Sequence, residues 1–178
     1  MSYNGKRKEE FNNMLEIRPV SKYEVMLAVY MFNNAFANQT IRYNEELLKL
    51  FRSERPEKNA EILERYKNKE LTIYGLYEDH IMIGTVILDG DLVRHLAVDA
   101  VHQHKGYASE LMRYLMLEAK KKGIKTLKVE CVGRNTPFYE KHGFKAVSDM
   151  EFTRYPHVKM EADLTKPIEL EIEEPAAI

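Results

Sequence analysis

An amphipathic helix set between two apolar strands is the feature of this sequence that most limits the fold. Its apolar residues recur at the spacing of one helical stripe: Ala108, Leu111, Met112, Leu115, Met116 and Ala119. Runs rich in apolar residues, 92–98 and 126–132, lie on either side of this helix. A strand, a helix of this length and a second strand form a parallel crossover, so the two strands are predicted to be neighbours in one sheet.

Both ends of this helix are marked in the sequence. It begins at Gly106-Tyr107-Ala108, and near its other end residues 120–122 are all lysine. Those lysines place positive charge against the negative end of the helix dipole. Gly123 follows and can adopt the left-handed conformation that ends many helices.

The residues before the crossover predict an antiparallel meander. Residues 72–77 and 81–88 are β-branched and aromatic runs joined by Glu78-Asp79-His80, as in a hairpin. Asp89-Gly90-Asp91 is a second tight turn, and it leads into the strand at 92–98. The sheet is therefore predicted to be mixed, mostly antiparallel with one parallel pair.

The N-terminal part predicts a strand followed by helices. Residues 15–20 alternate apolar and polar positions, and Ser21 can cap a helix whose apolar part spans 25–36 and closes at 38–40. A second helical region follows at 44–69. Because proline lacks an amide donor and restricts the preceding residue, Pro56 predicts two separate helices, 45–52 and 57–66.

The C-terminal part predicts a short helix and two more strands. Thr136 is the expected N-cap of that helix, Pro137 its first residue, and Gly143 its end. Strands are expected at 144–150 and 157–163. Residues 1–165 are thus predicted to form a single α/β domain, a mixed sheet with helices on both faces, and residues 166–178 an acidic tail.

Composition limits the class of protein. The chain has 178 residues and a formal net charge of -1, so no overall field draws it to nucleic acid or to a membrane. Cys131 is its single cysteine, which excludes an internal disulfide and favours a cytoplasmic location. The N-terminus lacks the apolar stretch of a signal peptide, and we expect a soluble protein.

The loop that enters the central helix has the chemistry of a phosphate site. A pyrophosphate can rest on the unpaired amides of a helix's first turn where small residues let it approach, as Gly106 and Ala108 do around Tyr107. Gln103, His104 and Lys105 add donors beside it, and Lys105 adds charge.

Residues 93–108 resemble the acetyl-coenzyme A-binding signature of the GCN5-related N-acetyltransferase (GNAT) superfamily. The core of that signature, Gln/Arg-x-x-Gly-x-Gly/Ala, is matched by Gln103, Gly106 and Ala108. Residues 135–144, Asn-Thr-Pro-Phe-Tyr-Glu-Lys-His-Gly-Phe, are similar to a second family segment, with a shortened gap between Asn135 and Phe138. The resemblance is densest over 70–162. It implies a GNAT-like fold in which the two parallel strands splay apart.

The resemblance also implies roles for several residues. The backbone of Leu96, Ala97 and Val98 would pair with the pantetheine arm of acetyl-CoA, and Asn135 would bond to that arm. Tyr139 would lie near the thioester sulfur and act as the acid for the departing thiolate. The region between the first helix and the second strand, which shapes the acceptor site in this family, carries no substrate signature.

The general base is where the sequence departs from the family. Members often carry a glutamate on the strand before the phosphate loop, and here Leu92 falls near that position. His95 on the same strand is the candidate base, and Glu130 on the neighbouring strand is a second candidate. His157 opens the last strand and could reach the acceptor.

Two other patterns are not assigned chemistry. His102 and His104 have no third ligand nearby, so no metal is predicted. Cys131 is interpreted as a small strand residue, because transfer in this family is direct and no Cys-His-Asn spacing is present.

The function expected from the sequence is acetyl transfer from acetyl-CoA to a primary amine of a small molecule or peptide. The alternative is a non-catalytic acyl-CoA-binding module, in which the missing glutamate reflects lost chemistry. An unrelated nucleotide-binding protein is disfavoured because both glycine-rich phosphate motifs of such proteins are absent. No nucleic-acid or membrane partner is expected, and a homodimer is compatible with the resemblance.

Overall fold

A computed structural model describes residues 14–41, 45–152 and 156–168. In chain order the strands are β1 (Leu15–Pro19), β2 (Leu71–Glu78), β3 (Ile81–Asp89), β4 (Leu92–Val98), β5 (Thr126–Val132), β6 (Lys145–Ala146), β7 (Glu151–Phe152) and β8 (Pro156–Asp163). The helices are α1 (Val25–Ile41), α2 (Glu45–Lys67), α3 (Tyr107–Lys121) and α4 (Thr136–Lys141). Single 3₁₀ turns occupy Ala100–His102 and Gly133–Asn135.

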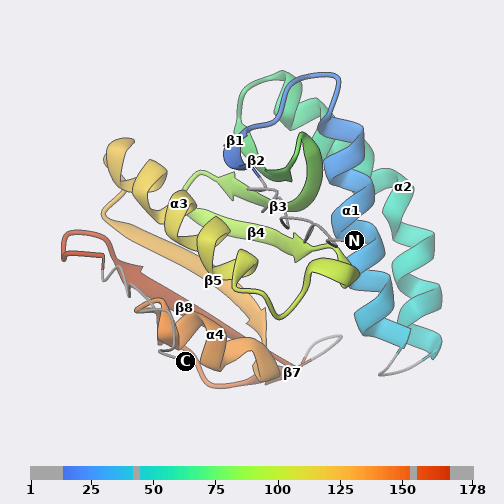
Figure 1. The fold of residues 1–178 in the computed structure, drawn as a ribbon. Coiled ribbons are helices and arrows are strands. Elements are labelled where there is room, and N and C mark those ends of the chain that lie inside the picture. Colours follow the sequence, from blue (N-terminus) through green and yellow to red (C-terminus); the bar gives the residue numbers. More distant parts are fainter. Residues whose placement is uncertain (1–13, 42–44, 153–155, 169–178) are drawn as a thin grey trace, which may run out of the picture.

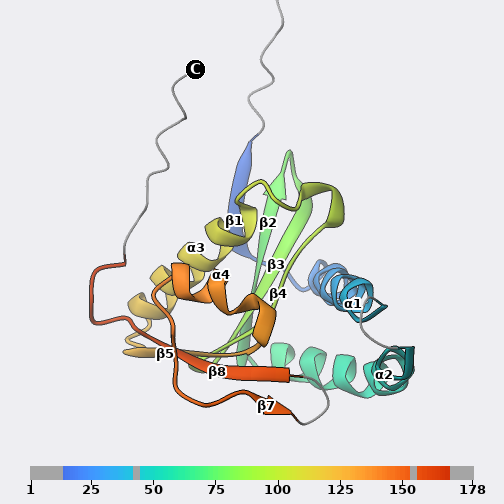
Figure 2. The same ribbon diagram turned by 90° about the horizontal axis from the view of Figure 1, so that it is seen from below.

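The described strands form one mixed sheet with helices on both faces. Its order is β1-β2-β3-β4-β5-β8-β6, with β7 paired to β8 outside this path. Helices α1 and α2 cover one face, and α3 and α4 cover the other (Figures 1 and 2). The fold class expected from the sequence is confirmed.

The parallel pair at the centre of the sheet is very short. Strands β4 and β5 pair only at Leu92↔Lys128 and Val93↔Val129, whereas the other strand pairs are antiparallel. Beyond Val93 the two strands are no longer in register as partners. This is the splayed pair that the resemblance implied.

A β-bulge in β4 accompanies the splaying. Thr85 of β3 pairs with Ala97 and Ile87 pairs with Arg94, so His95 and Leu96 together lie opposite Val86. His95 has a φ of 52°, a left-handed value that is uncommon for residues other than glycine. The bulge twists the end of β4 and alters its direction just before the phosphate loop.

The core lies in two layers, one on each face. The predicted stripe of α3 is buried against β2–β5, with Leu111, Met112 and Leu115 fully covered. On the other face, Ala28 and Phe32 of α1 and Ile62 of α2 pack on Ile73 and Ile87. Burial of these apolar surfaces is the main term that holds the helices on the sheet.

The prediction of two helices around Pro56 is wrong, because α2 runs unbroken from Glu45 to Lys67. Pro56 is exposed, so the carbonyl of Arg52 that loses its donor can be solvated. Tertiary contacts hold the helix on both sides of the proline. Before it, Arg55 donates a 3.2 Å hydrogen bond to Asn33 Oδ1 of α1. After it, Asn59 accepts a 3.0 Å hydrogen bond from Asn33, and Ile62 is buried.

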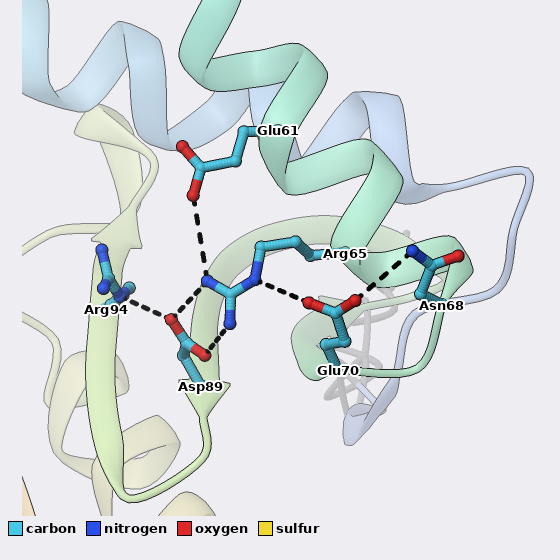
Figure 3. Close-up of polar contacts among 6 residues, drawn as sticks. All are labelled: Glu61, Arg65, Asn68, Glu70, Asp89 and Arg94. Atoms are coloured by element: carbon cyan, nitrogen blue, oxygen red, sulfur yellow. Dashed lines mark hydrogen bonds and ion pairs between the residues drawn. The ribbon is translucent and has the colours of Figure 1, made fainter.

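An ion-pair network fixes the C-terminal end of α2 to the sheet (Figure 3). Arg65 donates two hydrogen bonds to the carboxylate of Asp89 at the end of β3, at 2.8 and 2.5 Å, and one to Glu70 at 3.1 Å. Arg94 of β4 contacts the same carboxylate at 2.8 Å. Asp89 thus joins α2 to both strands of the β3–β4 hairpin.

Other boundaries differ from the predictions in smaller ways. Helix α1 continues through 38–40 to Ile41, because Asn, Gln and Thr lower helix propensity by only tenths of a kcal/mol. The strand expected at 144–150 is reduced to Lys145–Ala146, and β7 was not predicted. The N-cap of α4 is Asn135, whereas Thr136 is helical and donates to Gly133 O at 2.9 Å.

Two predicted segments lie partly or wholly outside the described residues. These are the start of the chain, residues 1–13, and most of the acidic tail, residues 169–178. Among the helices of the described part, none is long and apolar enough to cross a bilayer.

Candidate active site

Residues 99–106, in which a phosphate site was predicted and which are called the phosphate loop, connect β4 to α3 and end in a left-handed glycine. Gly106 is the N-cap of α3 with a φ of 84°, and a Cβ built on it would meet no atom within 4 Å. The space beside the first turn of α3 is therefore open. The first amides of α3 have no acceptor within the helix, and with the helix dipole they form a site suited to an anion.

A histidine held between two carboxylates anchors this loop to the end of β2. His102 Nδ1 lies 3.1 Å from Asp99 Oδ2, and His102 Nε2 lies 3.3 Å from Glu78 Oε2. The Tyr107 hydroxyl, on the first residue of α3, donates to Glu78 Oε1 at 3.0 Å. We refer to Glu78, Asp99, His102 and Tyr107 as the loop clamp.

The side chain of Gln103 turns back onto the strand. Its Nε2 donates to Val98 O at 3.0 Å, while the Asp99 amide donates to Ile83 O at 2.8 Å. These bonds fix the direction in which the loop leaves β4. His104, Lys105 and Gly106 remain exposed beyond them.

The splayed pair gives Leu96, Ala97 and Val98 a distinct environment. They follow the last β4–β5 partners, so one edge of their backbone faces the opening between the strands. Leu96 and Val98 pack toward the α3 side of the sheet, and Ala97 toward the α1 side. An extended chain placed in the opening could bond to this edge as an added strand does.

A cavity of about 590 Å³ lies between α1, the phosphate loop and the β5–α4 connection. It brings together four of the predicted cofactor-binding residues, Val98, Gln103, His104 and Asn135. Asp99, Ala100, Met82 and Arg134 also line it, and α1 forms its remaining wall. The cavity lining does not include His95 or Tyr139.

The α1 wall is the part of the site that sequence reasoning missed. Leu27, Tyr30, Met31, Asn34 and Ala35 line the cavity from this helix. A signal was present, because no charged residue occurs between Val25 and Ile41. A helix without charged residues lacks the strongly polar outer face of an ordinary surface helix, which is compatible with one side of it lining a cavity.

Tyr139, the predicted acid, lies in the core on the α3 side. Its side chain is 8% exposed and its ring makes edge contacts with Phe138 and Phe144, at centroid distances of 5.1 and 5.5 Å. Burial, and then the neighbouring Cys131, raise the pKa of the phenol well above its ordinary value. The phenol is therefore protonated at neutral pH, the form that can donate.

His95, the predicted base, is placed on the other side of the sheet. Its ring stacks on Phe32 of α1, with centroids 4.4 Å apart. Burial lowers the pKa of the imidazole to about 4, and the cations Arg55, Arg94 and Lys58 lower it further in the same direction. An imidazole with so low a pKa is neutral at pH 7 but is a weak proton acceptor.

The other titratable candidates point elsewhere. Glu130 is exposed on β5, opposite Lys159 of β8. His157 Nε2 lies 3.4 Å from Glu151 Oε2. Cys131 is buried beside Met160, and its burial raises the pKa of the thiol. In the described part of the chain, no group of three His, Cys, Asp or Glu side chains is arranged to hold a metal ion.

The geometry defines an α/β fold with a splayed parallel pair and, after β4, a loop that ends at a left-handed glycine where α3 begins. The family model described as "Acetyltransferase (GNAT) domain" matches residues 39–164, and the chain therefore belongs to the GNAT acetyltransferase family. The resemblance found in the sequence is confirmed. Membership makes the chain an acyl-CoA-dependent acetyltransferase in the general sense of the family.

Solved structures show the same fold at low sequence identity. PaiA N-acetyltransferase from Thermoplasma acidophilum, in complex with coenzyme A, is 22% identical over 84% of this chain and 99% of that chain, with a TM-score of 0.65. A GCN5-related N-acetyltransferase from Rhodopseudomonas palustris is 16% identical over 83% and 94%, with a TM-score of 0.71. FeeM, an N-acyl amino acid synthase from uncultured soil microbes, is 14% identical over 87% and 93%, with a TM-score of 0.67. No curated protein sequence matches the chain.

Proposed function

We propose that this protein transfers the acetyl group of acetyl-CoA directly to a primary amine of a small molecule or peptide. The observation that carries the proposal is the early end of β4–β5 pairing, after Val93 and Val129, directly before an anion-accepting helix start. The opening that could receive the extended arm of the cofactor is thus followed, along the chain, by the helix start that could receive its pyrophosphate. The coenzyme A bound in the Thermoplasma acidophilum protein of the same fold supports this assignment.

The cofactor would be held by both backbone and side chains. The amides of Gly106, Tyr107 and Ala108 would receive the pyrophosphate, with His104 and Lys105 beside it. The pantetheine arm would bond to the edge of β4 at Leu96, Ala97 and Val98. Asn135 lines the cavity across from the loop and would bond to the same arm.

Transfer requires one bond to form and one to break. The lone pair of the neutral amine attacks the thioester carbonyl carbon, and a backbone amide near Ala97 and Val98 stabilises the oxygen that becomes negative. The carbon–sulfur bond then breaks, and the sulfur takes a proton donated by Tyr139. The nitrogen loses one proton as the amide forms, and that proton restores the Tyr139 phenol, so a neutral amine and acetyl-CoA give an acetamide and free CoA.

The amine must first lose the proton of its ammonium form, and His95 is too weak a base to accept that proton. An alkylammonium has a pKa of about 10, far above the pKa of His95, which is about 4. We assign that proton to solvent in the cavity and give His95 the role of shaping the β4 bulge. A cavity wall that disfavours charge assists by lowering the pKa of the bound ammonium.

The test is acetyl-CoA turnover, followed as release of free CoA thiol, across monoamines, polyamines, amino acids, aminoglycosides and peptide N-termini. We expect release that requires both the enzyme and one class of amine, with the acetamide detected by mass. Tight acetyl-CoA binding in calorimetry with no release for any amine would instead support the non-catalytic acyl-CoA-binding module.

A further inference from the structure

The outer face of α1 is apolar although it is exposed. Tyr23 is 83% exposed, Tyr30 67% and Leu27 47%, and Met26 beside them is also exposed. Met26, Leu27 and Tyr30 lie on α1, which carries no charged side chain from Val25 to Ile41, and Tyr23 lies in the turn directly before the helix. Burial of Ala28, Val29 and Phe32 accounts for the opposite face only.

This exposed face continues into the cavity. Leu27 and Tyr30 belong to both, and Met31, Ala35 and Met82 extend the apolar surface inward. The other end of the same cavity is formed by Gln103, His104 and Asn135, which are assigned to the cofactor. A molecule that lies on the α1 wall therefore has the acetyl donor in front of it.

The charges of the lining limit what that molecule can be. Among the described residues that line the cavity, Asp99 is the one carboxylate, and its Oδ2 already lies 3.1 Å from His102 Nδ1. A polyamine would bring several ammonium groups that must lose water without gaining carboxylate partners, which is costly. A monoamine with an apolar body has to lose only one proton to enter as the neutral nucleophile, so it leaves no second ammonium group without a carboxylate partner.

We propose that the acceptor is a monoamine with an apolar alkyl or aryl body that packs against Leu27 and Tyr30, an inference that rests on the proposed function. The amino group points toward the splayed strands and the body lies along α1. The apolar wall performs two tasks: it binds the body of the acceptor and it favours the uncharged amine.

The test compares two acceptors of equal length, hexylamine and hexane-1,6-diamine, with 2-phenylethylamine as the aryl probe. The kcat/KM for hexylamine should exceed the kcat/KM for the diamine by about tenfold or more. Tyr30→Ser and Leu27→Ser should each raise the KM for hexylamine about tenfold, with the KM for acetyl-CoA unchanged. The matched control is Tyr23→Ser, in the exposed turn directly before α1 and outside the cavity lining, which should leave both KM values unchanged.

Calorimetry with the CoA-loaded protein separates this inference from the proposed function. Binding of hexylamine that is weakened by Tyr30→Ser, without turnover, would retain the inference and overturn catalysis. Preference for the diamine would overturn the inference and leave acetyl transfer intact. A rise in the KM for acetyl-CoA in Tyr30→Ser would also overturn the inference. So would a dimeric parent protein that both Tyr23→Ser and Tyr30→Ser convert to monomers while the KM for hexylamine stays unchanged.

Discussion

The rings of Phe32 and His95 stack with their centroids 4.4 Å apart and their planes 13° from parallel. This contact joins the middle of α1 to the bulge of β4, where His95 has a left-handed backbone with a φ of 52°. Histidine tolerates that conformation better than a β-branched residue does. The contact therefore places α1, which forms one wall of the cavity, relative to the strand that leads into the phosphate loop.

The half-buried imidazole of His95 should make the fold sensitive to acid. Its pKa is about 4 in the folded protein and about 6.5 in an unfolded chain, so between these values the unfolded chain binds more protons. The stability that the neutral His95 contributes is fully present above the pKa of the unfolded chain and is lost as the pH falls toward 4. His95→Asn should therefore lower the Tm at pH 7 but reduce the further fall in Tm between pH 7 and 5.

His80→Asn is the matched control for this prediction. His80 also has a positive φ, 69°, but it is exposed in the β2–β3 turn, so the variant should keep the pH dependence of the parent. An equal fall in Tm for the parent and His95→Asn would show that burial of His95 does not couple folding to protons.

Gly106 should be required for cofactor binding rather than for folding. Gly106→Glu places a long anionic side chain in the open space assigned to the pyrophosphate, and calorimetry should detect no binding of acetyl-CoA. Gly123→Glu is matched, because Gly123 has a φ of 80° at the other end of α3 and also meets no atom within 4 Å. Both variants carry the same backbone strain, of about 1–2 kcal/mol. Acetyl-CoA bound equally by the two variants would remove the pyrophosphate from this loop.

The parts of the fold that could be predicted are those that local chemistry determines. The six-residue stripe of α3 and the glycine after it specify a helix, and the bounds of β4 and β5 match the prediction at both ends. The turn at Asp79 and His80 was also predicted, and both residues have the positive φ values of a tight hairpin turn. Pro56 was misread because packing by Asn59, Ile62 and Arg65 outweighs what a single proline costs a helix.

Only part of the candidate site could be predicted from the sequence, for a different reason. The residues of the phosphate loop are contiguous, so Gln103 to Ala108 form a pattern in the sequence. The α1 wall and the loop clamp join residues far apart in the chain, such as Glu78 with His102, and no local rule relates them. Burial also changes chemistry without changing the residue type. As a free side chain His95 has a pKa suited to a general base, but its surroundings lower that pKa to about 4.

Asp89 should contribute strongly to stability through its contacts with Arg65 and Arg94. Its carboxylate is only 9% exposed, and the Arg65 guanidinium lowers its pKa. Asp89→Asn removes the anion that Arg65 and Arg94 share, leaving Arg65 with Glu70 only at its Nε, and should reduce the free energy of unfolding by about 2–4 kcal/mol in urea titration. Asp91→Asn, which breaks an exposed pair with Lys128, should cost no more than about 1 kcal/mol. Similar losses in the two variants would show that the network adds nothing beyond a surface pair.

Tyr139 should act on turnover and not on cofactor affinity. Tyr139→Phe removes the proposed proton donor and should lower kcat about a hundredfold, with the acetyl-CoA dissociation constant unchanged. Tyr74→Phe controls for the loss of a buried hydroxyl in the same core, since Tyr74 is 1% exposed. Parallel losses of kcat and affinity in Tyr139→Phe would make Tyr139 a packing residue.

The loop clamp should influence the affinity for acetyl-CoA through the position of the loop. Tyr107 begins α3, and its hydroxyl bond to Glu78 fixes the first turn whose amides are assigned to the pyrophosphate. Tyr107→Phe removes that bond alone, so an intramolecular hydrogen bond worth about 1 kcal/mol should appear as an acetyl-CoA dissociation constant about fivefold higher. The kcat at saturating acetyl-CoA should not change, because Tyr107 has no part in the bonds that form or break. Tyr114→Phe, on the same helix, is the control: within the described part of the chain its hydroxyl makes no hydrogen bond, and it contacts Tyr74 only through its ring. If both variants weaken binding equally, the effect belongs to helix α3 as a whole, and the clamp does not position the loop.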